Sequence, residues 1–170
     1  MPFGHFPRER GNPDRAAPPD SPLRENDDLV SVMSKNGYKP CVITKGDNLE
    51  IEIASGAMTR LAGVSEALSG STGIHLAIAT VPPGRCSTAH YHVNCESAIY
   101  VVSGEGLFLQ GEELEVEEVI GPGDFIYVPP DSNHQPVNTS EGEDLVLIVA
   151  RNAPVEIVVD LEEAGRQDCR

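Results

Sequence analysis

From Ile74 onward the chain is a series of short β-prone segments separated by Gly, Pro, Asn and Asp, and no other feature restricts the choice of fold as strongly. No long run with a helical period interrupts the series. Short segments punctuated by turn-forming residues are typical of all-β sandwiches and barrels, so we predict an all-β fold. Strands are expected at Ile74–Val81, His90–Tyr91, Ala98–Val102, Gly106–Leu109, Leu114–Val119, Phe125–Val128, Leu145–Ala150 and Val155–Val159.

The first part of the chain has a different composition. Residues 1–27 contain six prolines and many charges, with almost no aliphatic side chains. Such a segment cannot bury enough apolar surface to offset the entropy of ordering it. We predict a flexible N-terminal arm over 1–27 and a single barrel domain over 28–165. Within that domain we expect short strands at Cys41–Thr44 and Leu49–Ile53, and a loop over the mouth of the barrel at Ser55–Ser71.

The charge balance argues against polyanionic partners. The formal net charge is −15 and the pI is about 4.5, so the chain repels phosphate backbones and anionic lipid. No segment approaches the roughly 18 to 20 consecutive apolar residues of a membrane span. The N-terminus also lacks the apolar core of a secretory signal. We therefore predict a cytoplasmic protein with neither nucleic-acid nor membrane partners.

The chain has four cysteines, and no two of them have the C-x-x-C spacing of many metal and redox sites. Disulfides are rare in the reducing cytoplasm. We therefore interpret all four as free thiols. They are Cys41, Cys86, Cys95 and Cys169.

Two histidines have the spacing of metal ligands on a strand. Residues i and i+2 of a strand point to the same face, so His90 and His92 direct two imidazoles at one point. His134 follows a second Gly- and Pro-bounded strand and converges with them if the two strands are neighbours. Imidazole, with the carboxylate of Glu96 close by, suits Fe, Zn, Mn, Ni or Cu. We predict one divalent transition metal ion, whereas His75, at the start of an apolar strand, is predicted to be structural.

These residues resemble the two motifs of the cupin superfamily, G-x5-H-x-H-x3,4-E-x6-G and G-x5-P-x-G-x2-H-x3-N. The first motif matches Gly84, His90, His92, Glu96 and Gly104; the second matches Gly123, Pro129, His134 and Asn138, with Asp131 in place of a glycine. The 18 residues between the motifs are close to the short end typical of microbial cupins, and the segments 97–104 and 121–125 resemble small RmlC-like bacterial cupins. The resemblance implies a double-stranded β-helix, a jelly-roll-like barrel with a metal ion inside, and it also implies a homodimer.

One departure from the motif leaves the lining of the site open. The longer form of the first motif places its glutamate at position 97, where this chain has Ser97, with Glu96 one residue early. A slip of one residue moves a side chain to the opposite face of a strand. If Glu96 points inward, it is a metal ligand or catalytic carboxylate, and Tyr100 lines the pocket as a second catalytic residue. If Ser97 points inward, Ile99 and Val101 line a site of three histidines. We favour the first arrangement.

The leading interpretation is a metal-dependent enzyme that acts on a small molecule inside the barrel. Three neutral ligands leave the metal positively charged with open coordination positions, so that it can polarise a carbonyl or activate water or dioxygen. Dioxygenase, isomerase and lyase or hydrolase chemistry all fit. The alternative is a metal-bearing module that binds or senses a small ligand without catalysis.

Overall fold

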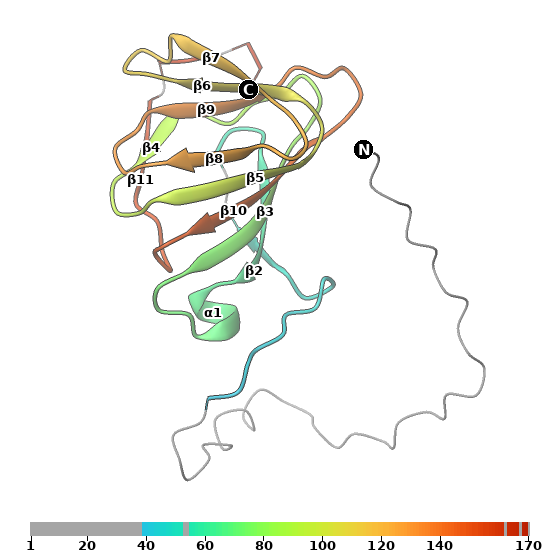
Figure 1. Cartoon of the computed structure of the whole chain (residues 1–170), viewed down its shortest axis with the longest axis vertical. Coiled ribbons are helices and arrows are strands. Elements are labelled where there is room, and N and C mark those ends of the chain that lie inside the picture. The colour runs from blue at the N-terminus through green and yellow to red at the C-terminus, as the bar shows by residue number, and fades with distance from the viewer. Residues whose placement is uncertain (1–38, 53–54, 162, 167, 170) are drawn as a thin grey trace, which may run out of the picture. The chain divides into compact units, whose positions relative to one another are not determined.

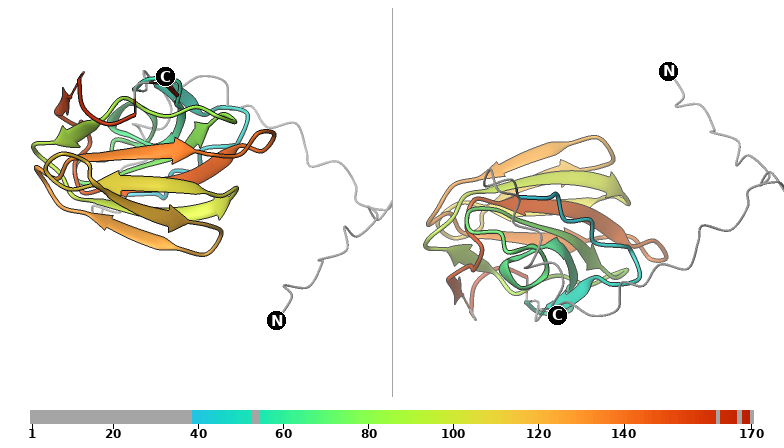
Figure 2. Two further views of the ribbon diagram at one scale, coloured as in Figure 1. Left: turned by 90° about the horizontal axis from the view of Figure 1, so that it is seen from above. Right: turned by 90° about the horizontal axis from the view of Figure 1, so that it is seen from below.

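The computed structural model describes residues 39–52, 55–161, 163–166 and 168–169, and within these it consists mainly of two antiparallel β-sheets (Figure 1). The first sheet has six strands in the order β1-β2-β3-β10-β5-β8, and the second has five in the order β11-β4-β9-β6-β7. Views from above and below show the strands on either side of a common interior (Figure 2). The predicted all-β, jelly-roll-like barrel is confirmed.

Eight of the strands correspond to the segments predicted from Ile74 onward, β1 corresponds to the strand predicted at Leu49–Ile53, and β2 and β9 were not predicted. The bounds are β1 (Glu50–Glu52), β2 (Thr59–Val64), β3 (His75–Val81), β4 (His90–His92), β5 (Ser97–Ser103), β6 (Gly106–Gln110), β7 (Val116–Ile120), β8 (Phe125–Val128), β9 (His134–Asn138), β10 (Leu145–Arg151) and β11 (Val158–Asp160). The helix α1 (Glu66–Ser69) has four residues, and no helix in the described ranges is long and apolar enough to cross a membrane.

The register of β10 divides the interior of the barrel into an aliphatic end and a polar end. Strand β10 pairs with β3 on one side and with β5 on the other. At its first residue, Leu145 lies opposite Val81, and both side chains are fully buried in the main hydrophobic cluster. At its last residue, Arg151 lies opposite His75 on β3 and Ser97 on β5, and all three are buried. Alternation along one strand thus places an arginine at the same interior face as the core leucines.

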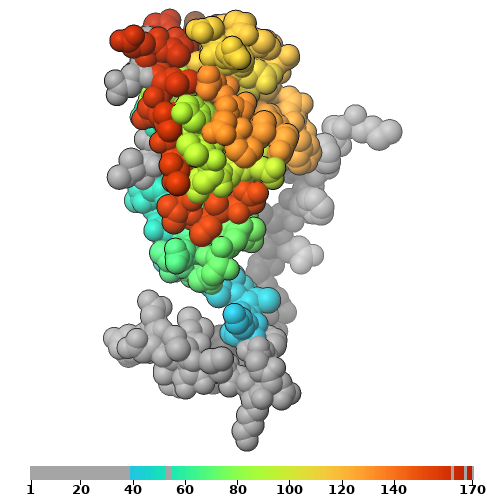
Figure 3. Space-filling model, turned by 90° about the vertical axis from the view of Figure 1, so that its left-hand side faces the viewer, coloured from blue at the N-terminus to red at the C-terminus, as the bar shows by residue number. Residues whose placement is uncertain are grey.

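The segment that follows β10 crosses from the six-stranded sheet to the five-stranded sheet. It ends in β11, which pairs antiparallel with β4 and places Val158 opposite His92. In the space-filling view the C-terminal part of the chain forms a continuous stripe along one side of the domain (Figure 3). This path carries residues 152–157 past β4, so side chains from the end of the chain reach the interior next to the motif histidines.

The prediction of four free thiols is wrong for two of the cysteines. Cys86 and Cys169 form a disulfide with a Cα–Cα distance of 5.3 Å across 83 residues of chain. The residues before Cys169 are also held to the barrel, because Gln135 accepts a hydrogen bond from the Arg166 backbone N–H at 2.7 Å and donates one to its carbonyl at 3.0 Å. Sequence spacing could not reveal this pair, since only folding brings Cys169 next to Cys86. Cys41 and Cys95 are free.

The structure also changes the interpretation of the first part of the chain. The segment predicted as a loop, Ser55–Ser71, contains β2, which pairs with β3 and buries Arg60 and Ala62 on its inner face. No strand forms at Cys41–Thr44, whereas β1 occupies the next predicted strand. Residues 42 to 170 form one compact unit. The predicted arm, 1–27, lies outside the described residues, so its flexibility stays a prediction.

Candidate metal centre

Three buried histidines converge inside the barrel, as the sequence predicted. His90 and His92 lie on β4, and His134 on β9 pairs directly with His90. One nitrogen from each ring lies within 4.8 Å of the others, and in the described part of the chain no other group of three ligating side chains comes this close. The ring centroids are 4.4 to 5.3 Å apart. We call these three residues the histidine cluster.

Hydrogen bonds determine which ring nitrogen remains available for a metal. The Nδ1 atom of His90 lies 2.7 Å from the Thr88 carbonyl, and that of His134 lies 2.9 Å from the Ser132 carbonyl. A carbonyl oxygen only accepts, so both rings carry their proton on Nδ1. This assignment leaves Nε2 of each ring unprotonated and able to bind a cation, with the ring orientation held by the backbone.

Burial keeps the histidine cluster neutral. Desolvation lowers the pKa of all three imidazoles, to about 4 for His92 and about 3 for His134. The charge that His90 would carry lowers the pKa of the other two further. Neutral imidazole is the form that binds a metal, so at neutral pH no proton has to leave before a cation binds.

Glu156 supplies a carboxylate to the cluster from outside both motifs. Its Oε2 lies 3.2 Å from Nδ1 of His92 and 2.9 Å from Nε of Arg151, and its Oε1 accepts a hydrogen bond from Arg60. Burial alone would raise the pKa of Glu156, but the two guanidinium groups outweigh burial and hold it below its ordinary value. Glu156 is therefore an ionised, partly buried carboxylate. The one sequence signal for it was a single acidic residue within the apolar run 155–159.

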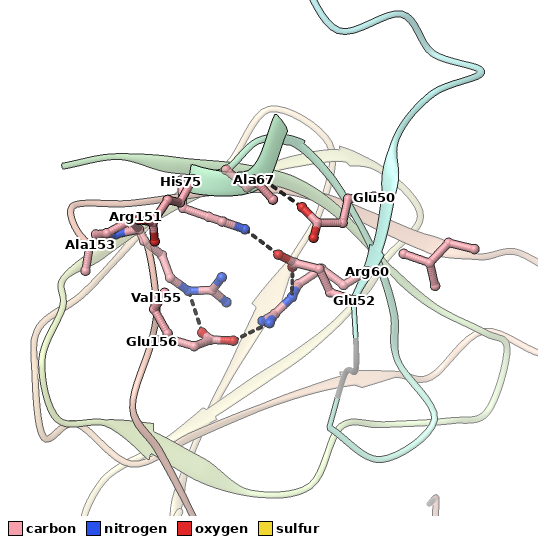
Figure 4. Close-up of a pocket in the computed structure, with 13 residues that line it drawn as sticks. Glu50, Glu52, Arg60, Ala67, His75, Arg151, Ala153, Val155 and Glu156 are labelled. Carbon is pink, nitrogen blue, oxygen red and sulfur yellow. Dashed lines mark hydrogen bonds and ion pairs between the residues drawn. The ribbon is translucent and has the colours of Figure 1, made fainter. Parts of the chain in front are cut away.

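Further side chains continue this charged network away from the histidine cluster (Figure 4). Arg60 also binds Glu52, with 2.6 Å between Nε and Oε2, and the other oxygen of Glu52 lies 2.6 Å from Nε2 of His75. The predicted structural role of His75 agrees with this contact. Every carboxylate oxygen of Glu52 and Glu156 therefore has a cationic or imidazole partner.

The prediction that Glu96 points toward the metal site is wrong. Glu96 is exposed on the outer face, where it accepts hydrogen bonds from Tyr127 at 3.0 Å and from Asn152 at 3.2 Å. Tyr100, which shares that face, is 38% exposed and does not line the site. The buried residue is Ser97, because its pairing opposite Arg151 places it on the inner face.

The alternative register that the sequence left open is therefore the one in the structure. Ile99 and Val101 are buried together with Ser97, as that register requires. The Oγ atom of Ser97 has no hydrogen-bond partner among the described residues. The group that could hold a metal is therefore three histidines, and a carboxylate from outside both motifs, Glu156, lies beside His92.

Three cavities surround the network. A chamber of about 30 Å³, enough for one or two waters, is lined by the histidine cluster, Ser97, Arg151 and apolar side chains. A second cavity of about 220 Å³ lies against His90, His92 and Glu156. The largest, about 590 Å³, lies between β1, β2, α1, β3 and the β10–β11 connection, with Arg151 and Glu156 in its wall (Figure 4).

Comparison with known proteins agrees with this architecture. Residues 77–151 match the family model described as "Cupin domain". A segment of 61 residues is 39% identical to an uncharacterised protein of Methanocaldococcus jannaschii, covering 35% of this chain and 46% of that protein. The match thus spans about half the length of that curated relative.

Solved structures also share the fold. The polyketide cyclase RemF from Streptomyces resistomycificus superimposes with a TM-score of 0.59 at 21% identity, covering 74% of this chain and 87% of the cyclase. Oxalate decarboxylase from Bacillus subtilis, described with Mn(II) centres, superimposes with a TM-score of 0.55 at 25% identity, covering 65% of this chain but 29% of the decarboxylase. At these sequence identities and coverages, the similarity shows a shared fold.

Proposed function

Since the chain contains a cupin domain, we propose that it is an enzyme that acts on a small molecule at one divalent transition metal ion held by the histidine cluster. The observation that carries the proposal is the convergence of three buried, neutral imidazoles, two of which have Nδ1 tied to backbone carbonyls. Such a donor set binds a cation without the cost of first removing protons or reorienting rings.

The residues present fit such an ion. Nitrogen ligands suit Fe, Zn, Mn, Ni and Cu, and the similar decarboxylase is described with Mn(II). A bound metal would supply a Lewis acid with open coordination positions. Around it, the charge of Glu156 lies 3.2 Å from Nδ1 of His92, and Ser97 Oγ faces the chamber as a spare hydroxyl that can donate a hydrogen bond to a ligand. The apolar remainder of the chamber wall excludes bulk water.

The reaction belongs to the chemistry that a positive metal in a dry chamber promotes, namely dioxygenase, isomerase, or lyase and hydrolase reactions. Support for catalysis comes from the fold neighbours, which include a cyclase and a decarboxylase. The second candidate is a metal-bearing module that binds a ligand without turnover. About 30 Å³ admits neither a substrate nor a ligand without movement, so in both candidates the small molecule has to reach the histidine cluster from a neighbouring cavity.

Elemental analysis of the purified chain, together with the variant His134→Ala, tests the metal assignment. One metal ion per chain is expected in the native protein and far less than one in the variant, while His75→Gln, which alters a histidine outside the cluster, should keep its metal. Full metal retention in His134→Ala would refute the site. An oxygen-consumption and turnover screen with small acids, diketones and thiols then separates an enzyme from a binding module.

We also propose that the chain forms a homodimer. Support comes from the outer face of β5 and β8, where Phe125 is 81% and Tyr127 is 64% exposed, with Tyr100 packed 4.8 Å from the Phe125 ring. Exposed aromatic side chains grouped on one face are typical of protein interfaces. The occupant that we assign to this face is a second copy of the chain, as the resemblance to cupins implied.

A further inference from the structure

Arg151 is a buried arginine with spare hydrogen-bonding capacity. The residue is only 7% exposed, because its position at the end of β10 turns its side chain into the barrel. A guanidinium group carries five N–H donors in one plane. Among the residues that the structure describes, the side-chain partner of Arg151 is Glu156, which lies 2.9 Å from Nε. Neither of its terminal nitrogens has a hydrogen bond or ion pair with any residue that the structure describes.

The terminal nitrogens face open space rather than packed side chains. Arg151 lines the 590 Å³ cavity, and Figure 4 shows its guanidinium directed into the space between His75 and Arg60. The partly buried acidic groups beside it do not need these donors, because both oxygens of Glu52 and both oxygens of Glu156 already have partners. A buried charge whose donors lack partners is costly, so these donors have to be satisfied by ordered water or by a ligand in the cavity.

We propose that the terminal N–H groups of Arg151 bind the carboxylate group of a small-molecule ligand in this cavity. The planar fork of a guanidinium matches the two oxygens of a carboxylate, which gives two parallel charge-assisted hydrogen bonds. The cavity volume admits a molecule of several non-hydrogen atoms, unlike the inner chamber. The cavity wall carries four carboxylates, Glu50, Glu52, Glu66 and Glu156, and two guanidinium groups. At the Arg151 end, Arg60 and Arg151 offset Glu52 and Glu156, so this end is the place where an anion can bind.

Arg151 also lines the chamber of the histidine cluster, so a carboxylate that it holds lies at the boundary of the metal site. If the proposed function holds, that ligand is the substrate, and the inference rests on the proposed function in this respect. The substrate class is then carboxylic acids. Glu156 connects the two regions, because it contacts both Arg151 and His92.

Calorimetric titration with malonate tests the inference, using acetate as a second probe and malonamide as the uncharged analogue. Malonate or acetate should bind the native chain, and malonamide should not. The variant Arg151→Gln should lose affinity by at least about tenfold, because a neutral amide cannot form the charge-assisted pair. The matched control is Arg166→Gln, which removes an exposed arginine paired with Glu117 and should bind as the native chain does. Equal affinity in Arg151→Gln would overturn the inference, as would no binding of either acid by the native chain.

The titrations are repeated on metal-loaded and metal-stripped protein, with the metal content measured each time. If the chain binds metal but neither acid, this inference fails and the proposed metal site stands. If the chain holds no metal, the proposed function fails, and binding of malonate to the metal-free chain still decides the role of Arg151.

A second measurement covers the case that Arg151→Gln does not fold. In the unmodified chain, malonate should shift the backbone amide resonances of Ala67 and Ala153, which line the cavity, and leave those of Gln110 and Glu118 unchanged. Unchanged resonances at Ala67 and Ala153 at saturating malonate would overturn the assignment. If inorganic phosphate shifts the same resonances at lower concentration than malonate, the site is a phosphate site and the carboxylate assignment is wrong.

Discussion

Oε2 of Glu156 lies 3.2 Å from Nδ1 of His92, although 64 positions separate the two residues in the chain. The carboxylate lies beside Nδ1, where its negative charge can raise the basicity of the ring toward a metal. Arg60 and Arg151 hold the carboxylate itself from two other directions. Carboxylates in this relation to a ligating histidine typically change metal affinity by about 10- to 100-fold.

We therefore expect Glu156→Gln to lower metal affinity by at least about tenfold while the barrel remains folded. Competition with a metallochromic chelator measures the change. The matched control is Glu96→Gln, which alters the carboxylate of the first motif but lies on the outer face and should leave affinity unchanged. The reverse result, with a loss in Glu96→Gln alone, would mean that Glu96 reaches the metal and that the register described above is wrong.

Removal of the metal should lower the thermal stability of the native chain. A metal that binds the folded chain much more tightly than the unfolded chain adds free energy of unfolding by mass action. Differential scanning calorimetry with and without a chelator should show a higher midpoint for the metal-bound protein. In His134→Ala the chelator should have little effect on the midpoint. If the chelator lowers the midpoint of that variant as much as that of the native chain, the stabilising metal binds elsewhere.

The metal-free chain should lose stability as the pH falls from 6.5 toward 5. The folded pKa values of His92 and His134, about 4 and about 3, lie below the ordinary value of 6.5. In this range the unfolded chain binds more protons than the folded chain, so the free energy of unfolding rises with pH, by up to about 1.4 kcal/mol per pH unit for each histidine. Urea unfolding of metal-free protein across this range measures the slope. His134→Gln should have a shallower slope, and equal slopes would contradict the assignment.

The disulfide should contribute strongly to stability. In the chain-entropy account, closing a loop of this length adds about 4 to 5 kcal/mol to the free energy of unfolding. The variant Cys169→Ser, compared with the native chain by urea unfolding under oxidising conditions, should lose most of this amount. Cys41→Ser, which removes an exposed free thiol, serves as the control and should be neutral. If both variants have the same urea unfolding midpoint as the native chain, the disulfide does not form in solution.

Association of two copies should depend on the aromatic face of β5 and β8. Light scattering should give the mass of two chains for the native protein and of one chain for Phe125→Lys, because a charge at the centre of an apolar interface is costly to bury. Val119→Lys alters an equally exposed apolar residue on β7, in the other sheet, and should leave the mass unchanged. A native protein with the mass of one chain would contradict the dimer.

The local pattern of apolar, turn-forming and histidine residues was enough to predict the all-β fold and the three histidines that cluster inside it. Strand alternation alone places His90 and His92 on one face, and the second motif locates His134. These features depend on the two-residue period of a strand and on turn-forming residues, which are local properties. Even there, one position was ambiguous: the same pattern allowed Glu96 or Ser97 to point inward, since a single residue in the turn before β5 reverses every side chain that follows.

Tertiary structure decided that register and the surroundings of the histidines. Ser97 faces inward because β5 pairs with β10, which places it opposite Arg151. Glu156 reaches His92, and Cys169 reaches Cys86, because the C-terminal segment crosses from one sheet to the other. These contacts join residues more than 50 positions apart, and no local period encodes them. They form only when burial of the core brings distant strands together, which is why the charged network around the site was absent from every prediction made from the sequence.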